Sequence, residues 1–211
     1  MELKKAITER RSVRSFKNKN IKIQDIYECI DNSKFAPSSG NLQNWKVVVI
    51  QDSEKIKNLA VACLRQRWIS EAPLVLVMCS EPDVTVKVYN ERGNIYAVEN
   101  VSLFTQNLTL LLHEKGLGSC LVASFDKNAV RRIIKIPDNV EPLFVVPIGY
   151  PNQNHKEPIR KELEHFVYYE EWGVKEKSTV HDIKRIKEEI KKKTKPFYEK
   201  VINVLKKKKS N

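Results

Sequence analysis

Near its N-terminus the chain reads Arg10-Arg11-Ser12-Val13-Arg14-Ser15-Phe16. The first five of these residues hold three guanidinium groups and a hydroxyl, where a helix predicted over residues 2–10 ends. Planar guanidinium forks bind phosphate oxygens in pairs, so the cluster indicates a site for a phosphate group. Cations are also favourable at a helix C-terminus, so a solvated helix end is the competing interpretation.

A second polar cluster is Pro37-Ser38-Ser39-Gly40-Asn41-Leu42-Gln43. It is rich in residues that break or cap helices, and it is predicted to form a loop just before a buried strand. Its amides can donate and accept hydrogen bonds at once, which suits the polar edge of a heteroaromatic ring. An ordinary turn with a helix cap explains the same residues.

The glycines of Gly116-Leu117-Gly118-Ser119-Cys120 do not predict a dinucleotide-binding loop. They follow a predicted helix rather than a strand, and Leu121 stands where GxGxxG requires its third glycine. The pattern therefore excludes a Rossmann fingerprint.

Helical and strand-like segments alternate along the chain. Apolar periodicity predicts further helices over residues 24–34, 54–64, 96–115 and 127–134, with Ser53 and Asp126 as N-caps. Apolar runs predict strands over residues 45–50, 73–79, 119–123 and 142–150, whereas residues 82–94 are expected to be polar and irregular. This alternation predicts a sheet covered by helices on both faces.

The composition predicts a globular chain with a core, because 41% of the 211 residues are hydrophobic. No stretch approaches the ~20 apolar residues that cross a bilayer. The first five residues lack the apolar run of a signal peptide, so a cytoplasmic location is predicted. The cysteines, which show no metal-ligand spacing, are expected to be buried reduced thiols: Cys29, Cys63, Cys79 and Cys120.

The net charge of +12 belongs mostly to a C-terminal tail, residues 173–211. The tail holds 14 lysines and arginines against 5 acids and so carries +9 of the total. It is expected to form one or two amphipathic helices over residues 180–208. Packing across a dimer, binding to an anionic partner and simple solvation all fit this pattern. Interleaved acids and few aromatic residues argue against a dedicated nucleic-acid surface, and no membrane partner is predicted.

Five segments in order resemble the nitroreductase family over residues 1–172. They are Arg10–Phe16, Pro37–Trp45, the helix from Gln106 that leads into Ser119, Val146–Pro151, and the basic pair Arg160-Lys161. The resemblance implies an α+β fold, a three-layer α/β/α sandwich with a central mixed sheet, in an intertwined homodimer. It also implies a domain at residues 1–172 that binds FMN, followed by the tail.

The resemblance assigns most cofactor contacts residue by residue. Arg10, Ser12 and Arg14 would hold the FMN phosphate and ribityl chain, with Arg11 as a neighbouring contact. Arg160 and Lys161 would approach the same phosphate. The partner subunit would supply Pro37, Ser38, Ser39, Asn41 and Gln43. The flavin ring would lie by Leu121, Val122 and Ala123, with the Ala123 N–H facing flavin N5.

The activity implied is that of an FMN-dependent NAD(P)H oxidoreductase. In its ping-pong cycle NADH or NADPH delivers hydride to flavin N5, and a nitroaromatic, quinone or similar electrophilic acceptor then takes the electrons. The chemistry belongs to the flavin, so no residue is predicted to act as a catalytic acid or base, and no metal is predicted. The alternatives are a specialised flavin reductase or dehalogenase of the same fold, and a flavin-binding protein whose basic tail binds an anionic partner.

The sequence also departs from the family pattern. Asn44 replaces the usual proline and is expected to loosen the turn into the strand, Asn100 stands where an acid is expected, and Leu121 stands where tryptophan or proline is common. If the short segment of residues 83–94 forms a lid, Tyr89, Glu91 and Arg92 are candidate substrate contacts. Plain solvent exposure is the competing interpretation of these three residues.

Overall fold

The structure, a computed structural model, describes residues 1–153 and 157–175. The chain divides into two compact units, residues 1–157 and 158–211. All strands of the described part belong to the first unit. The division into a flavin domain at residues 1–172 and a tail at residues 173–211 stays a prediction. The helices expected over residues 180–208 lie outside the described residues.

One sheet of four strands forms the centre of the first unit. Its order is β1-β2-β4-β3, with β1 (Trp45–Ile50), β2 (Leu74–Ser80), β3 (Gly118–Ser119) and β4 (Glu141–Gly149). Neighbouring strands are antiparallel, and Val77 lies opposite Val48 of β1 and Val145 of β4. The parallel component of the expected mixed sheet is a single isolated bridge, between Ser12 and Ser119.

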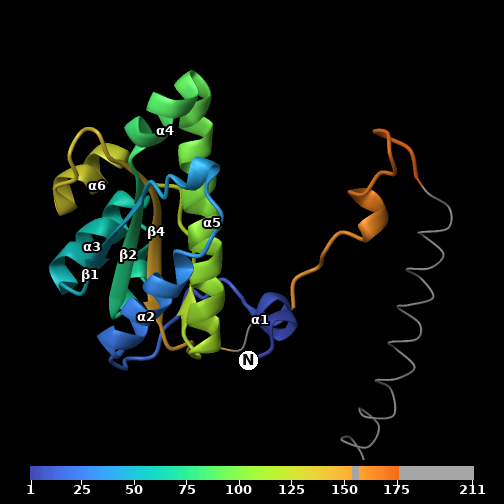
Figure 1. The fold of residues 1–211 in the computed structure, drawn as a ribbon. Helices are drawn as coiled ribbons and strands as arrows, with labels where there is room; N and C mark the ends of the chain where they lie inside the picture. Colours follow the sequence, from blue (N-terminus) through green and yellow to red (C-terminus); the bar gives the residue numbers. More distant parts are fainter. Residues whose placement is uncertain (154–156, 176–211) are drawn as a thin grey trace, which may run out of the picture. The chain divides into compact units, whose positions relative to one another are not determined.

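Helices cover both faces of this sheet, as expected for a three-layer α+β sandwich (Figure 1). One face carries α3 (Ser53–Ala62) and α6 (Lys127–Ile134), and the other carries α2 (Ile23–Ser33) and α5 (Gly93–Glu114). Strand β2 is buried along its whole length, and its side chains alternate between the two cores. Val75, Val77 and Cys79 join the α3–α6 core, and Leu74, Leu76 and Met78 join the α2–α5 core. Burial on both faces explains the continuous apolar run.

The expectation of irregular structure over residues 82–94 is wrong. The segment forms α4 (Pro82–Tyr89) and a 3-10 turn, η3 (Asn90–Arg92), before α5 begins. The hydroxyl of the fully buried Thr85 donates to the Gly93 carbonyl at 2.7 Å and approaches the Pro82 carbonyl at 2.8 Å. Tertiary contacts therefore hold a helix that the local sequence does not favour.

Two predicted helix caps have different outcomes. Asp126 is the N-cap of α6, and its carboxylate accepts a hydrogen bond from the Ala129 N–H at 3.0 Å, as predicted. The prediction that Ser53 caps α3 is wrong by one residue. Asp52 holds that position and accepts from the Lys55 N–H at 2.8 Å.

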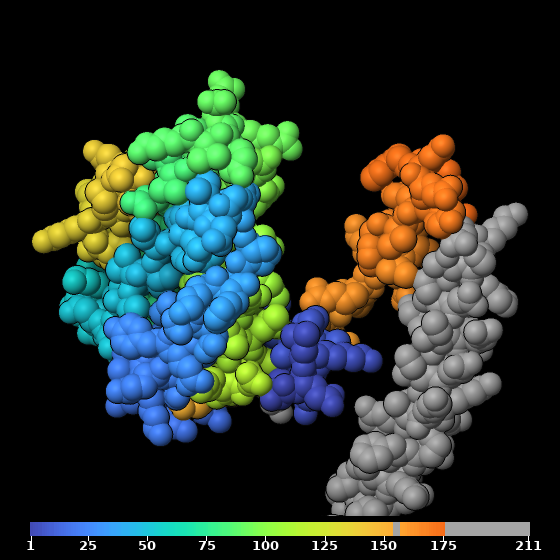
Figure 2. All heavy atoms as spheres, viewed as in Figure 1, coloured from blue at the N-terminus to red at the C-terminus, as the bar shows by residue number. Residues whose placement is uncertain are grey.

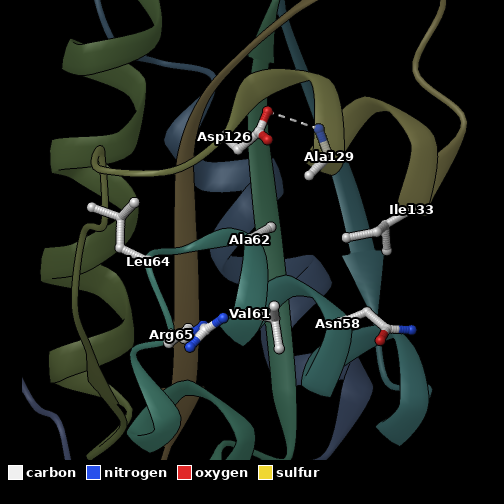
Figure 3. A pocket seen from close by; sticks show the side chains of 8 residues that line it. All are labelled: Asn58, Val61, Ala62, Leu64, Arg65, Asp126, Ala129 and Ile133. Carbon is white, nitrogen blue, oxygen red and sulfur yellow. Dashed lines mark hydrogen bonds between the residues drawn. The ribbon is translucent and has the colours of Figure 1, made fainter.

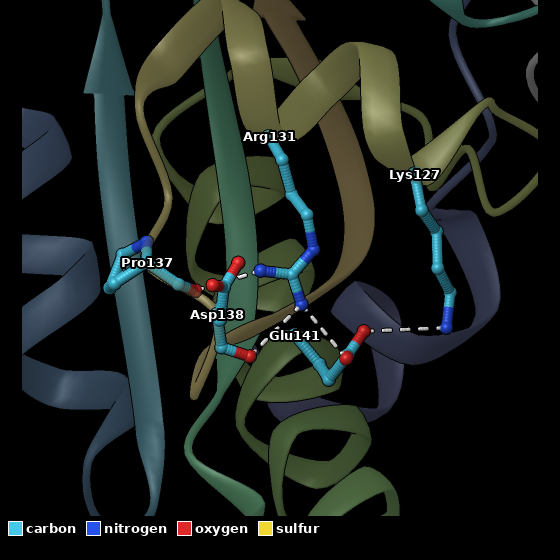
Figure 4. A network of polar contacts seen from close by, with 5 residues as sticks. All are labelled: Lys127, Arg131, Pro137, Asp138 and Glu141. Atoms are coloured by element: carbon cyan, nitrogen blue, oxygen red, sulfur yellow. Dashed lines mark hydrogen bonds and ion pairs between the residues drawn. The ribbon is translucent and has the colours of Figure 1, made fainter.

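A polar network fastens α6 to the start of β4 (Figure 4). The Arg131 guanidinium donates to the Pro137 carbonyl at 2.7 Å and to a Glu141 carboxylate oxygen at 2.8 Å. Lys127 approaches the other carboxylate oxygen of Glu141 at 3.4 Å. These contacts account for Lys127 and Arg131 of α6 as groups that stabilise the fold.

Two glycines let the Arg10–Phe16 segment pack onto the sheet edge. A Cβ atom on Gly118 would lie 2.6 Å from a methyl group of Val13, and one on Gly149 would lie 2.7 Å from the Phe16 ring. Val13 and Phe16 are both buried. The glycines are therefore required for this close approach, which settles where the segment's other side chains point.

The four cysteines are all free and buried, as predicted. Burial raises the pKa of Cys63 and of Cys79 to about 12 and that of Cys29 to about 11. These three thiols are therefore protonated and poorly nucleophilic. None of the helices within the described ranges has the length and apolar character to cross a membrane.

The described part of the second unit is short. It contains one 3-10 turn, η4 (Leu163–His165), and an aromatic pair whose ring centroids, those of Tyr168 and Trp172, lie 4.6 Å apart. The Lys175 ammonium lies 4.0 Å from the Tyr168 ring centroid. These contacts close a small turn around residues 163–175.

We predict that Gly118→Ala lowers the free energy of unfolding by about 1–3 kcal/mol, because the new methyl group meets Val13. Urea denaturation measures this change. In the double variant with Val13→Ala, both Val13 methyl groups are gone, and of the three closest atoms only the Cβ atom, at 2.8 Å, remains. The added cost of Gly118→Ala should then shrink, and strictly additive effects would contradict the packing argument.

Candidate functional site

The Arg10–Phe16 segment runs along the sheet edge as an extended chain. The Val13 N–H donates to the Ser119 carbonyl at 3.0 Å, and the Lys17 N–H donates to the Tyr150 carbonyl at 2.9 Å. Side chains alternate along an extended chain. With Val13 packed inward, Ser12 and Arg14 are exposed on the outer side.

Arg10, Ser12 and Arg14 gather around the Cys120 thiol. Burial raises the pKa of this thiol, while the positive charge of Arg14, a hydrogen bond from Ser12 and the positive charge of Arg10 oppose the rise. Neither arginine pairs with a carboxylate anywhere in residues 1–153 and 157–175. The structure thus brings three of the predicted phosphate ligands together, with two cations free to meet an anion.

Arg11 points back towards the preceding helix, α1 (Leu3–Glu9). Its Nη1 donates to the Thr8 carbonyl at 2.6 Å and approaches the Arg10 carbonyl at 2.9 Å. Carbonyl groups at a helix C-terminus lack partners within the helix, and a guanidinium satisfies them. Arg11 therefore differs from its two neighbours in the cluster, because its Nη1 already donates to backbone carbonyl groups.

Sequence analysis missed Trp68, which lies against this cluster. The Arg14 guanidinium carbon lies 5.9 Å from the centroid of the Trp68 ring, within cation–π range. Trp68 belongs to the 3-10 turn η2 (Arg67–Glu71) and packs against the α3–α6 core. It therefore supports Arg14 from the side. No local pattern in the sequence joins two residues 54 positions apart.

In place of the strand predicted over residues 119–123, the two-residue β3 is followed by an extended segment, residues 120–123, which makes one isolated bridge and lies beside these arginines. Val122 is buried and exchanges two backbone hydrogen bonds with Val145, each 2.9 Å long. Leu121 and Ala123 are exposed on either side of it. The Ala123 N–H has no hydrogen-bond partner in the described part of the chain. A free donor on an exposed extended segment is what the predicted contact with the flavin ring requires.

The Pro37–Gln43 loop is a strained turn on another part of the unit. Residues 39–41 form a 3-10 turn, η1, in which Gly40 and Asn41 both have φ of +57°, and Gln43 has φ of +46°. The Gln43 side-chain amide donates to Asn41 Oδ1 at 3.1 Å. The exposed amides are therefore held in a fixed arrangement, at some cost in backbone strain.

A buried amide pair anchors this loop to α5. Asn100 Oδ1 accepts from the Ser39 N–H at 2.9 Å, and Asn100 Nδ2 donates to Asn44 Oδ1 at 2.8 Å. Asn44 Nδ2 donates in turn to the Ala97 carbonyl at 3.3 Å. Both asparagines are only 1% exposed. The expectation that Asn44 loosens the turn is therefore wrong, since its side chain joins the loop to the long helix.

The α4–α5 corner lies against the same loop. Figure 2 shows the loop (light blue) next to the corner (green), and a Cβ atom on Gly40 would lie 2.7 Å from the Tyr89 hydroxyl. The Tyr89 and Tyr96 rings meet edge to face with centroids 4.9 Å apart, and Arg92 Nε donates to the Tyr96 hydroxyl at 2.8 Å. Of the three candidate substrate residues, Tyr89 belongs to this aromatic pair and Arg92 contacts it, and both Glu91 and Arg92 are exposed.

A hollow of about 590 Å³ lies between α3 and α6 (Figure 3). None of the predicted site residues lines it. Val61, Leu64 and Ile133 give it an apolar lining, and its carboxylate, Asp126, already caps α6. No group of three or more potential metal ligands occurs within the described residues. The candidate site is therefore the arginine cluster with the extended segment of residues 120–123.

The sequence model of the nitroreductase family matches residues 7–150. The chain belongs to the nitroreductase family. It is 29% identical over 154 residues to an Archaeoglobus fulgidus protein named putative NADH dehydrogenase/NAD(P)H nitroreductase, covering 71% of this chain and 86% of that protein. It is 25% identical over 167 residues to the FMN reductase (NADPH) of Bacillus subtilis, covering 72% of this chain and 67% of that protein.

The fold agrees with solved structures of the family. The crystal structure of the nitroreductase family protein from Streptococcus pneumoniae TIGR4 superposes with a TM-score of 0.74 at 22% identity. The match covers 80% of this chain and 100% of the other. At this level of identity the match establishes the shared fold.

We predict that Asn100→Ala lowers the free energy of unfolding by about 1–3 kcal/mol, because it leaves the Ser39 N–H and Asn44 Oδ1 buried without a partner. Chemical denaturation measures the change. Gln106→Ala, an exposed amide on the same helix, is the matched control and should change stability by less than about 0.5 kcal/mol. Equal effects of the two substitutions would argue against the buried network.

Proposed function

We propose that the protein is an FMN-dependent NAD(P)H oxidoreductase. The observation that carries the proposal is the pair of guanidinium groups of Arg10 and Arg14, which have no carboxylate partner in the described residues. They extend from a backbone segment that is packed on the sheet edge, and they lie beside the extended segment of residues 120–123, in which the Ala123 N–H is free. A ligand with a phosphate at one end and a polar planar ring at the other would bind the two guanidinium groups with its phosphate and accept from the Ala123 N–H with its ring.

The residues present fit FMN. Arg10, Ser12 and Arg14 would bind the phosphate and ribityl chain through charge-assisted hydrogen bonds. The exposed backbone at Leu121 and Ala123 would lie along the ring, and the free N–H would donate to it. Bound FMN supplies hydride transfer from NADH or NADPH and onward reduction of an electrophilic acceptor such as a nitroaromatic or a quinone. The relationship to an FMN reductase (NADPH) supports this assignment.

Other predicted contacts extend this proposal. Arg160 and Lys161 belong to the second unit, and both are exposed. We propose that they add positive charge at the phosphate. The α4–α5 corner, with Tyr89, Glu91 and Arg92, would border the space for the electron acceptor. In this scheme the protein's own groups bind and orient the flavin and donate hydrogen bonds to it, and none serves as a nucleophile.

We also propose a homodimer in which each Pro37–Gln43 loop serves the partner's flavin site. Three apolar side chains of α5, Ile95, Val98 and Leu103, are 58%, 43% and 44% exposed. Leu3 and Ile7 of α1, a helix that contacts α5, are also exposed. Adjacent exposed apolar residues indicate a surface that another chain covers. The loop's anchoring to α5 through Asn100 would tie its position to that interface.

We predict that the purified protein shows a bound-flavin absorption spectrum that NADH or NADPH bleaches without oxygen. Arg14→Ala should weaken FMN binding by about 1.5–3 kcal/mol, which is roughly 10- to 150-fold in Kd, because a charge-assisted contact is lost. Fluorescence titration of the apoprotein measures Kd. Arg132→Ala removes an exposed cation from α6 and should leave Kd unchanged. An unchanged Kd in Arg14→Ala would contradict the phosphate placement.

We predict that Val98→Asp and Leu103→Asp each shift the protein towards monomer, because a carboxylate buried at the α5 surface opposes association. Sedimentation velocity measures the change, and flavin occupancy should fall with dimer content. Val61→Asp is the matched control, since Val61 is 62% exposed on α3, on the other side of the sheet. Loss of flavin without loss of dimer would count against a shared site.

A further inference from the structure

A second cavity lies beside the Arg10–Phe16 segment and has a volume of about 290 Å³. The end of α1, the last turns of α5, β3 and the residues after β4 form its walls. Arg11 and Val13 line it, whereas Ser12, Arg14 and Cys120 do not. The cavity therefore opens on the residues that alternate with the proposed flavin ligands, and it shares only Arg10 with them.

Two buried nitrogen atoms of this cavity's lining have no hydrogen-bond partner. They are Arg11 Nε and His113 Nε2, the only such side-chain atoms within residues 1–153 and 157–175. Buried polar groups are almost always paired, and an orphan donor costs on the order of 1–3 kcal/mol. The Arg11 Nε–H can only donate, and His113 Nε2 donates in the tautomer that carries its proton there, so one group that accepts hydrogen bonds would satisfy both atoms.

The surrounding charge indicates that this group is an anion. Arg10 and Arg11 line the cavity, and Glu9 is its only acid. Burial lowers the pKa of His113, and the charges of Arg10, Arg11 and Lys5 lower it further against the opposing effect of Glu9. A water molecule would satisfy the hydrogen bonds but would leave the positive potential uncompensated.

We propose that this cavity is a second anion site, which binds a small oxyanion such as phosphate or a carboxylate. The oxyanion would accept from the Arg11 Nε–H and from the His113 Nε2–H, with Thr109, Ser119 and Gln153 as further polar neighbours. The volume is well above the ~30 Å³ that one water occupies in the liquid, so an oxyanion fits with its remaining waters.

A bound oxyanion would join three parts of the fold. Arg11 already holds the last carbonyls of α1, and His113 lies in the last turn of α5. An anion between them would fix the N-terminal end of the Arg10–Phe16 segment without using Ser12 or Arg14. The site would therefore support the segment that carries the proposed flavin ligands.

The test uses FMN-saturated full-length protein, so that the flavin's own phosphate cannot account for the effect. Inorganic phosphate is titrated at constant ionic strength against chloride, and thermal unfolding is followed. We predict a saturable rise of the midpoint by about 2–4 °C. The imidazole NMR signals of His113 should shift with the same apparent Kd.

Variants localise the effect. Arg11→Gln and His113→Gln should each reduce the phosphate-dependent rise at least threefold, while Arg132→Gln should retain it. His113→Asn keeps the proposal testable if Arg11→Gln fails to fold. The proposal is overturned if the midpoints of these variants rise with phosphate as that of the wild type does. It is also overturned if the wild-type midpoint does not change up to 100 mM phosphate, which would leave ordered water as the occupant of the cavity.

A third outcome would assign the cavity to the flavin. Phosphate that competes with FMN in the apoprotein but has no effect on the FMN-saturated protein would overturn the second site. If the protein binds no FMN at all, the same phosphate titration is carried out on it directly. Failure of the proposed function and failure of the second anion site are therefore distinguishable.

Discussion

The close approach of Val13 to Gly118 and of Phe16 to Gly149 is the contact on which the candidate site depends. Because neither glycine has a Cβ atom, the Arg10–Phe16 segment lies directly on the sheet edge, with hydrogen bonds from Val13 to Ser119 and from the following Lys17 to Tyr150. Because side chains alternate along an extended chain, the inward packing of Val13 fixes the face on which its two neighbours lie. Val13 is buried, and Ser12 and Arg14 therefore face the extended segment of residues 120–123.

A second constraint is the neutral amide pair between the Pro37–Gln43 loop and α5. A carboxylate at position 100 could accept from Ser39 but would be a buried charge. Asn100 accepts from Ser39 and gives its own N–H to Asn44, so the pair satisfies itself without charge. The two departures from the family pattern, Asn44 and Asn100, are therefore linked, because each side chain satisfies the other by a hydrogen bond. The long helix then carries both the loop and the exposed apolar side chains of the proposed interface.

Much of the fold could be predicted from the sequence, because a strand that is buried on both faces, such as β2, consists of consecutive apolar residues. Strand β1 has the predicted bounds, and the helices around it are within a few residues. Helix α4 could not be predicted, because Val84, Val86 and Val88 alternate like a strand and the stabilising bond joins Thr85 to Gly93. β-Branched residues have low helix propensity, and here a tertiary hydrogen bond overrides it.

The site was predictable in part. The cluster at Arg10–Arg14 was visible, but the separation of Arg11 from its neighbours depends on an extended backbone that packs at every second residue. Asn44 was misjudged because its partner, Asn100, lies 56 positions away on α5. Trp68 was missed for the same reason. Local patterns identify which residues carry chemistry, and long-range packing decides which of them point the same way.

The most direct test is an experimental structure of the protein with FMN bound. The account predicts that the flavin phosphate contacts both Arg10 and Arg14, that the Ala123 N–H faces the flavin ring, and that Val13 and Phe16 stay packed on their glycines. A phosphate bound away from both arginines, with the Arg10–Phe16 segment still packed as here, would contradict it.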